Sequence, residues 1–259
     1  MSRNVGNDRH ITIFSPEGKL YQLEYAFKAI RLPGDTTIGV KGKDTVCLIT
    51  TKKIQDKLID PLSVTRMYNI TKNIGVCVTG RIPDARALIY KCRSIAAEFK
   101  FDNGYDIPVR YLANKVANYN QIFTQHAYKR VYGCSILFCS IDDELGPRLY
   151  MVDPAGACYG YSGVATGAKE QTAMSTLEKM YSEIQKDLGD KKEDINNACF
   201  GNNKQETIEF AIEALQKVLG VDFKSNQVEV AVVTQNYTKF SLLKQKEIDD
   251  YLTAISERD

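Results

Sequence analysis

Residues 8–30 read DRHITIFSPEGKLYQLEYAFKAI, and this stretch decides the fold of the chain. Its first part alternates apolar and polar residues, which is typical of an extended segment. Ser15, Pro16 and Gly18 then occupy the positions that a type I turn favours for these residue types. From residue 19 the spacing becomes helical, with one apolar stripe formed by Leu20, Leu23, Phe27 and Ile30. The pattern therefore predicts a tail, a rigid turn and an amphipathic helix over 19–31.

The same stretch closely resembles the opening of the proteasome alpha subunits. Their pattern is Asp-Arg followed by a Thr-x-Phe-Ser-Pro-x-Gly-x-Leu-x-Gln-x-Glu-Tyr-Ala block. The matching positions in this chain are Asp8, Arg9, Thr12, Phe14, Ser15, Pro16, Gly18, Leu20, Gln22, Glu24, Tyr25 and Ala26. The residues that follow this block, and the last three residues, Glu257-Arg258-Asp259, look most like one subtype within the family. One position departs from the pattern, because Asn7 stands where the family has Tyr or Phe.

Composition excludes several classes of protein. The 259 residues carry a formal net charge of +2, with 25% charged residues, which is not the basic excess of a nucleic-acid-binding chain. No apolar run reaches the roughly 20 residues that span a bilayer, and the first residues are polar. We therefore expect no nucleic acid, no membrane and a location on the cytosolic side, and the resemblance implies the cytoplasm and the nucleus. Seven cysteines, an odd number with no CxxC, argue against a disulfide framework or a zinc site, and no cofactor is implied.

Strand and helix patterns alternate along the rest of the chain. The predicted strands are 37–40, 46–50, 66–70, 74–79, 134–141, 148–152, 159–165, 228–234 and 240–243. The predicted helices are centred on 85–99, 109–123, 173–188, 208–219 and 248–255. Short turns between strands imply antiparallel sheets, and helix pairs must bury their stripes on sheet faces, so the class is α+β.

The resemblance implies how these layers are ordered. Proteasome subunits are four-layer αββα sandwiches with the fold of the N-terminal nucleophile hydrolases, and the order of elements here fits that fold. We expect a single domain over 1–259, with a gate tail at 1–14. The segment 189–204 is rich in Asp, Lys and Asn and is interpreted as an exposed insert.

Catalysis is the next question, because the beta subunits of the family are threonine proteases. They expose an N-terminal Thr by cutting between Gly and Thr, and the free amine then acts as the base. By the resemblance, the nucleophile position falls near Asp35, the catalytic Asp near Thr51 and the Lys near Arg66. No Gly-Thr dipeptide occurs in this sequence, and an Arg does not give up its proton at neutral pH. The chain is therefore expected to be non-catalytic, and a self-processing hydrolase of the same fold is the alternative.

The first helix and the tail have expected roles in the family. The helix packs at the interface within a ring of alpha subunits, which implies contacts from Leu20, Tyr21, Gln22, Glu24 and Phe27. The tails meet over the pore and block it, and an aromatic residue, Asp, Pro and Tyr hold the open form. The corresponding gate residues here are Asp8, Arg9, Pro16 and Tyr25. Because Asn7 cannot supply a flat apolar face, we expect this tail to help close the gate without being its main latch.

Two further residues match a binding site of the family. Arg66 and the neighbouring Gly80 fall where members with Lys at the first position form pockets between adjacent alpha subunits. Those pockets receive the C-terminal carboxylates of activator proteins, and an Arg can pair with a carboxylate through two parallel hydrogen bonds. A surface Arg on a strand edge is the alternative, and the sequence leaves both open.

The resemblance thus implies a structural and gating subunit of the outer ring of the proteasome core particle, in ATP- and ubiquitin-dependent protein degradation. Its expected partners are other alpha subunits in a seven-membered ring, the beta subunits below it, and the tails of regulatory caps or activators. A free-standing binding protein is a third hypothesis, and it predicts a monomer that purifies without relatives.

Overall fold

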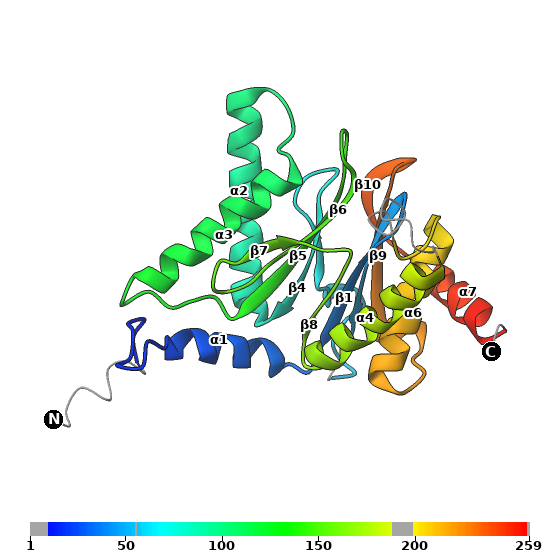
Figure 1. The fold of residues 1–259 in the computed structure, drawn as a ribbon, viewed down its shortest axis with the longest axis horizontal. Helices are drawn as coiled ribbons and strands as arrows, with labels where there is room; N and C mark the ends of the chain where they lie inside the picture. Colours follow the sequence, from blue (N-terminus) through cyan, green and yellow to red (C-terminus); the bar gives the residue numbers. More distant parts are fainter. Residues whose placement is uncertain (1–9, 55, 188–198, 258–259) are drawn as a thin grey trace.

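Two antiparallel five-stranded sheets lie face to face and are covered on both sides by helices (Figure 1). The computed structural model describes residues 10–54, 56–187 and 199–257. The strands are β1 Thr36–Lys41, β2 Thr45–Thr51, β3 Met67–Asn69, β4 Gly75–Gly80, β5 Cys134–Asp142, β6 Gly146–Val152, β7 Cys158–Gly160, β8 Gly163–Gly167, β9 Val228–Thr234 and β10 Tyr237–Leu242. The helices are α1 Tyr21–Arg31, α2 Ile82–Asn103, α3 Val109–Gln125, α4 Glu170–Asp187, α6 Lys204–Leu219 and α7 Gln245–Ser256, with short 3₁₀ turns η2 Pro61–Ser63 and η3 Ser225–Gln227.

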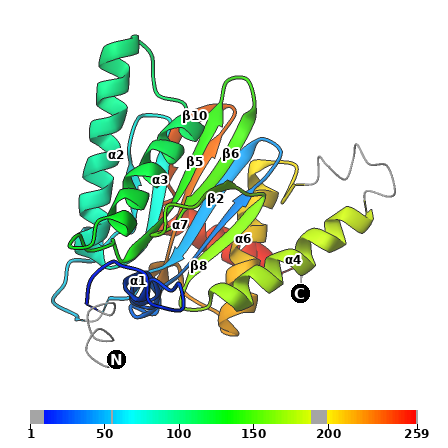
Figure 2. The ribbon, with the colours of Figure 1, turned by 60° about the vertical axis from the view of Figure 1, so that its left-hand side comes forward.

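The sheet order brings distant parts of the chain together. One sheet runs β10-β9-β2-β1-β8 and the other runs β3-β4-β5-β6-β7. In the first sheet, β2 pairs with β9 over its whole length, so residues 45–51 lie against residues 228–234. Figure 2 shows the strands between α2 and α3 on one side and α4 and α6 on the other.

Three hydrophobic clusters fill the spaces between the layers. One lies between the first sheet and α4, α6 and α7, and another between the second sheet and α2 and α3. The third lies between the sheets and includes Leu48, Leu137, Leu149 and Phe240. The layers are therefore helix, sheet, sheet and helix, which is the four-layer αββα sandwich of the N-terminal nucleophile hydrolase-like fold.

One predicted strand is in fact two. The pattern over 159–165 predicted a single strand, whereas β7 pairs with β6 in one sheet and β8 pairs with β1 in the other. The chain crosses between the sheets at Tyr161 and Ser162. β7 is half-buried to exposed, whereas β8 is largely buried, so the two short strands differ in their surroundings although they follow each other directly in the sequence.

The predicted insert 189–204 is also corrected where the structure describes it. Residues 188–198 lie outside the described part, but Phe200 is buried in the core cluster beneath α4 and α6, against Tyr181 and Phe210. The backbone N–H of Phe200 donates to the Lys41 carbonyl over 3.0 Å. The end of the segment is therefore packed on β1, and α6 begins at Lys204, inside the range predicted as exposed.

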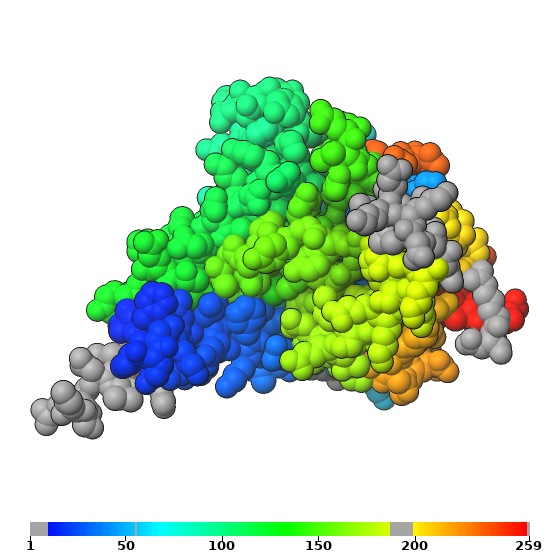
Figure 3. All heavy atoms as spheres, in the orientation of Figure 1, coloured from blue at the N-terminus to red at the C-terminus, as the bar shows by residue number. Residues whose placement is uncertain are grey.

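The first helix begins later than its pattern predicted, and Leu23 and Phe27 of its apolar stripe are only half-buried. It starts at Tyr21, not at residue 19, after a turn in which the Gly18 N–H donates to the Ser15 carbonyl over 2.9 Å. Only Ala26 and Ile30 are buried, against the ends of β4 and β5. Figure 3 shows this segment on the surface, beside the end of α3.

Candidate functional site

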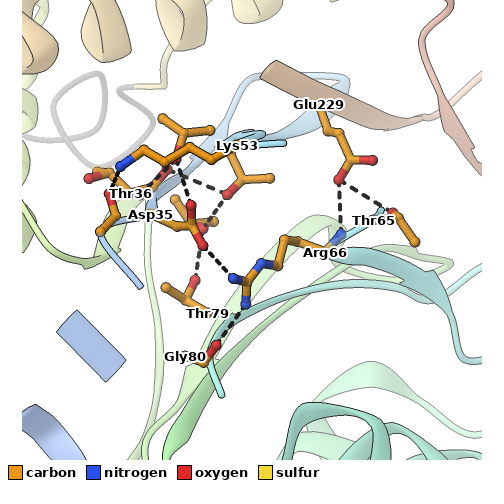
Figure 4. A network of polar contacts seen from close by, with 12 residues as sticks. Asp35, Thr36, Lys53, Thr65, Arg66, Thr79, Gly80 and Glu229 are labelled. Carbon is orange, nitrogen blue, oxygen red and sulfur yellow. Dashed lines mark hydrogen bonds and ion pairs between the residues drawn. The ribbon is translucent and has the colours of Figure 1, made fainter. Parts of the chain in front are cut away.

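The three positions that correspond to a catalytic constellation lie beside one another, and Figure 4 shows two of them, Asp35 and Arg66. Asp35 precedes β1, Thr51 ends β2 and Arg66 precedes β3. The guanidinium of Arg66 forms an ion pair with the Asp35 carboxylate, and Thr51 Oγ1 donates to Asp35 Oδ1 over 3.5 Å. The positions predicted by resemblance are therefore neighbours in space.

The groups at these positions cannot perform the threonine-protease reaction. That reaction needs a hydroxyl nucleophile whose own α-amine is free to act as the base. Asp35 supplies a carboxylate, and its nitrogen is in a peptide bond to Gly34. Its carbonyl accepts from the Ala168 N–H over 2.8 Å, so the backbone is fixed on both sides. At the position of the Lys, Arg66 supplies a guanidinium that is held in the ion pair with Asp35.

Below this pair, hydroxyl groups are paired with one another between the sheets. Thr37 Oγ1 and Thr50 Oγ1 are 2.8 Å apart, and Thr79 Oγ1 donates to Thr37 Oγ1 over 2.7 Å. All three residues are buried. Because buried hydroxyls are stable only when hydrogen-bonded, this layer fixes β1, β2 and β4 relative to one another.

Glu229, on β9, holds the segment that carries Arg66. Its carboxylate accepts from the Arg66 N–H over 2.9 Å and from Thr65 Oγ1 over 3.3 Å, and Lys52 Nζ lies 3.5 Å away. This residue was not predicted from the sequence. Its signal is an acid within the apolar strand VEVAVVT, because a buried carboxylate in a strand needs partners.

A cavity of about 420 Å³ opens beside this network. Both predicted pocket residues, Arg66 and Gly80, line it. Its other lining residues are the basic Lys52, Lys53 and Arg81, the acidic Asp35 and Glu229, the polar Thr51, and the apolar Pro33, Ile54, Ile59, Val64, Ile82 and Pro83. A basic cavity with an apolar wall can bind the free carboxylate of a chain that also has apolar side chains.

Arg66 and Gly80 are also bonded to each other. Arg66 Nη1 donates to the Gly80 carbonyl over 2.7 Å, and the Arg66 side chain is only 11% exposed. Gly80 has φ of +119°, and a Cβ there would lie 2.3 Å from the Gly133 carbonyl, so the close approach requires glycine. Arg66 is therefore not an exposed arginine on a strand edge, because its guanidinium is largely buried and bonded within the fold.

The beginning of the described chain is anchored to the loop after α3. The Thr12 N–H donates to the Ala127 carbonyl over 2.8 Å, and Thr12 Oγ1 donates to the Lys129 carbonyl over 3.1 Å. Asp8 and Arg9 lie outside the described residues. The other two predicted gate residues, Pro16 and Tyr25, are exposed, and the Tyr25 ring stacks on Tyr21 with 6.5 Å between centroids.

That loop is held in turn by Asp84, near the start of α2. The Asp84 carboxylate accepts from Arg130 Nη1 and Nη2 over 2.6 and 2.7 Å, and from the Gly133 N–H over 2.8 Å. Burial alone would raise the pKa of the Asp84 carboxyl. The hydrogen bonds from Arg130 and Gly133, and the positive charge of Arg130, outweigh burial and hold this pKa below its usual value.

We expect Asp84→Asn to lower the free energy of unfolding by about 1–3 kcal/mol at pH 7 because it weakens charge-assisted hydrogen bonds. The folded-state pKa is depressed, so the ionised group stabilises the protein above its unfolded pKa, about 3.9. That stabilisation is lost as pH falls through the folded-state value. In urea unfolding, the difference from wild type should therefore shrink in acid. Asp102→Asn, at an exposed position on the same helix, should change little, and a difference that grows in acid would contradict the prediction.

Other reactive groups in the described residues point to no further chemistry. Burial raises the pKa of the Cys77, Cys92 and Cys134 thiols to about 12, so they are protonated at neutral pH. No group of three or more potential metal-binding side chains occurs within 10–54, 56–187 and 199–257. In the same part of the chain, none of the helices has both the length and the apolar character needed to cross a membrane.

Two family descriptions match this chain. The proteasome subunit family matches residues 33–233, and the N-terminal signature of the A-type proteasome subunits matches residues 8–29. The chain is 44% identical to the proteasome alpha type-6 subunit of Caenorhabditis elegans, with 100% of each chain covered. It is 42% identical to the probable proteasome alpha type-1 subunit of Schizosaccharomyces pombe, with 100% of each covered. The proteasome alpha subunit of Methanosarcina thermophila is 32% identical, over 100% of this chain and 97% of its own.

The chain therefore belongs to the proteasome subunit family and is of the alpha type, as its opening residues predicted. Alpha type-6, the subtype whose opening and end it resembles most, is also the type of the Caenorhabditis elegans relative. The signature over residues 8–29 marks alpha subunits, which are the non-catalytic subunits.

Proposed function

We propose that this alpha-type subunit forms part of a seven-membered outer ring of the proteasome core particle, supports the beta subunits and controls entry of substrates. The observation that carries the proposal is the first helix. Of its apolar stripe, Leu20, Leu23 and Phe27 stay half-exposed in the isolated chain, and the buried residues of the helix are Ala26 and Ile30. A half-exposed apolar stripe on an amphipathic helix is suited to a second protein surface.

The residues proposed for the ring contact lie on that helix and beside it. Tyr21 and Gln22 are half-exposed, and Glu24 is exposed. Phe14, in the preceding turn, has 73% of its surface exposed. Aromatic side chains with one apolar and one polar end are common in such contacts, which supports an interface with adjacent alpha subunits.

Native mass spectrometry of the chain purified from cells, with gentle lysis, tests the proposal. We expect it in a complex with other alpha and beta subunits, and with its amino-terminal extension intact. A stable monomer would contradict the ring and favour a free-standing binding protein. A chain shortened to a new N-terminal nucleophile would favour the self-processing hydrolase, the alternative that the alpha signature does not favour.

The tail is proposed to help close the entrance to the particle. Thr12 anchors the start of the described chain on the loop after α3. Asp8, Arg9, Pro16 and Tyr25 would contribute to the gate, without the aromatic residue that Asn7 replaces. The cavity around Arg66 and Gly80 is proposed as the docking site for the C-terminal tails of regulatory caps.

We expect deletion of residues 1–9 to raise the peptide-hydrolysing activity of the assembled particle modestly. The tail is one of several that would cover the pore, so its removal opens only part of the barrier. Hydrolysis of a short fluorogenic peptide by wild-type and truncated particles at equal concentration measures the effect. Thr12→Val should move activity in the same direction, because the tail loses its side-chain anchor. Unchanged latency in both variants would exclude the gate role.

The cellular setting is proposed from the same assignment. The particle would act in ATP- and ubiquitin-dependent protein degradation, in the cytoplasm and the nucleus. No cofactor or metal is required for a subunit whose work is mechanical.

A further inference from the structure

The cavity beside Arg66 has the chemistry of a carboxylate-binding site, but its two carboxylates come from the chain itself. Four basic side chains and two acidic ones line it. The Glu229 carboxylate accepts hydrogen bonds from the Arg66 N–H and from Thr65, and it forms an ion pair with Lys52. The Asp35 carboxylate forms an ion pair with the guanidinium of Arg66 (Figure 4).

The ion pair between Asp35 and Arg66 is well shielded from water. The two side chains are 7% and 11% exposed. Thr51 Oγ1 donates to the other oxygen of Asp35 over 3.5 Å, and the backbone of Asp35 is fixed by Ala168. Since Gly80 also accepts from Arg66 Nη1, the guanidinium is oriented by two internal acceptors, and its positive charge is compensated within the fold.

An incoming carboxylate would therefore meet a compensated cation. Its attraction to Arg66 is offset by repulsion from Asp35, and like charges in one partly buried site disfavour each other strongly. By contrast, Lys53 at the rim donates to the neutral Gly34 carbonyl over 2.8 Å and has no acidic partner in the described part of the chain.

We propose that Asp35 is a built-in competitor for Arg66, and that it keeps this docking cavity in a state of low affinity for the free C-terminal carboxylate of a partner protein. Asp35 occupies the side of the guanidinium that a partner's carboxylate needs, and Lys53 at the rim provides the remaining attraction. This inference rests on the proposed function only in taking the cavity as a docking site for a polypeptide C-terminus.

The test compares Asp35→Asn with wild type in particles purified from cells. The probe is a short peptide that ends in two leucines and a free carboxylate, chosen for the apolar wall, and it carries a photoreactive group. Crosslinking to this chain, resolved by mass from the other subunits, is measured against probe concentration. The control probe is the same peptide with a C-terminal amide. The control variant is Asp102→Asn, which makes the same change of net charge at the C-terminal end of α2, whereas the cavity lies at the start of this helix.

We expect Asp35→Asn to lower the half-saturating concentration of the acid peptide about tenfold, which corresponds to about 1.4 kcal/mol, and to leave the amide peptide and the Asp102→Asn particle unchanged. Equal binding to wild type and Asp35→Asn, or an equal gain for the amide, would overturn the proposal. Asp35→Ser is the second variant. If neither variant assembles, the ion pair serves the fold and the proposal is also wrong. Failure of the proposed function is seen separately, as a wild-type chain recovered without other subunits.

Discussion

Phe240→Ala is expected to lower the free energy of unfolding by about 3–5 kcal/mol, the usual cost of removing a buried aromatic ring. Phe240 lies on β10 at 2% exposure, in the cluster between the two sheets. Its ring covers Gly75 of the opposite sheet so closely that a Cβ on Gly75 would lie 1.9 Å from it. Removal of the ring leaves a space in the buried cluster between the two sheets, so the cost should lie in the upper part of the usual range for core substitutions.

Denaturant unfolding of the purified chain at neutral pH measures the effect, with Phe101→Ala as the control. Phe101 is 90% exposed on α2, and its removal should change stability by less than about 0.5 kcal/mol. Gly75→Ala alone should also destabilise strongly, because its methyl group meets the Phe240 ring. Combined with Phe240→Ala, it should cost less than the two changes added together, since the methyl group then enters vacated space. Additive costs would show that the two residues do not share one packing site.

The elements of this fold were predictable where one residue pattern dominates locally. The run VCLITT of β2 and the stripe of α3 each indicate their own structure. The order of the strands in the sheets was not predictable from the sequence. It depends on the pairing of β2 with β9, which are far apart in the sequence, and many apolar strands could pair with β2 equally well. The resemblance of residues 8–30 to a family supplied the layers. The split of 159–165 into β7 and β8 was missed for the same reason, since it depends on pairing with β6 in one sheet and with β1 in the other.

The candidate site was predictable in its positions but not in its pairing. The resemblance placed Asp35, Thr51 and Arg66 at one site, and they are neighbours. It did not indicate that Asp35 would neutralise Arg66, because a sequence shows two ordinary polar residues 31 positions apart. Glu229 and Lys53 come from other strands and loops, and only the folded chain brings them to the cavity.

The strongest electrostatic effect is expected from Arg66→Ala. This change leaves the Asp35 carboxylate buried, at 7% exposure of its side chain, without its cation. Removing one partner of a buried ion pair typically costs about 3–5 kcal/mol, because the remaining charge is uncompensated. Asp35→Ala should cost less, since Arg66 keeps its 2.7 Å hydrogen bond to the Gly80 carbonyl.

The double variant Asp35→Ala with Arg66→Ala should therefore be more stable than Arg66→Ala alone, although it lacks more side-chain atoms. Denaturant unfolding of wild type, both single variants and the double variant gives the coupling energy, which should be at least about 1 kcal/mol for contacting residues. The contrary outcome is a double variant that is less stable than Arg66→Ala by the full cost of Asp35→Ala. In that case the two side chains are not coupled. The ion pair then does not stabilise the fold, and Asp35 does not compete with a partner's carboxylate for Arg66. If the coupling is found, Arg66→Ala weakens both the stability of the fold and the docking of a C-terminal carboxylate. Asp35→Asn is then the variant that distinguishes the two effects, because it keeps Arg66 in the cavity.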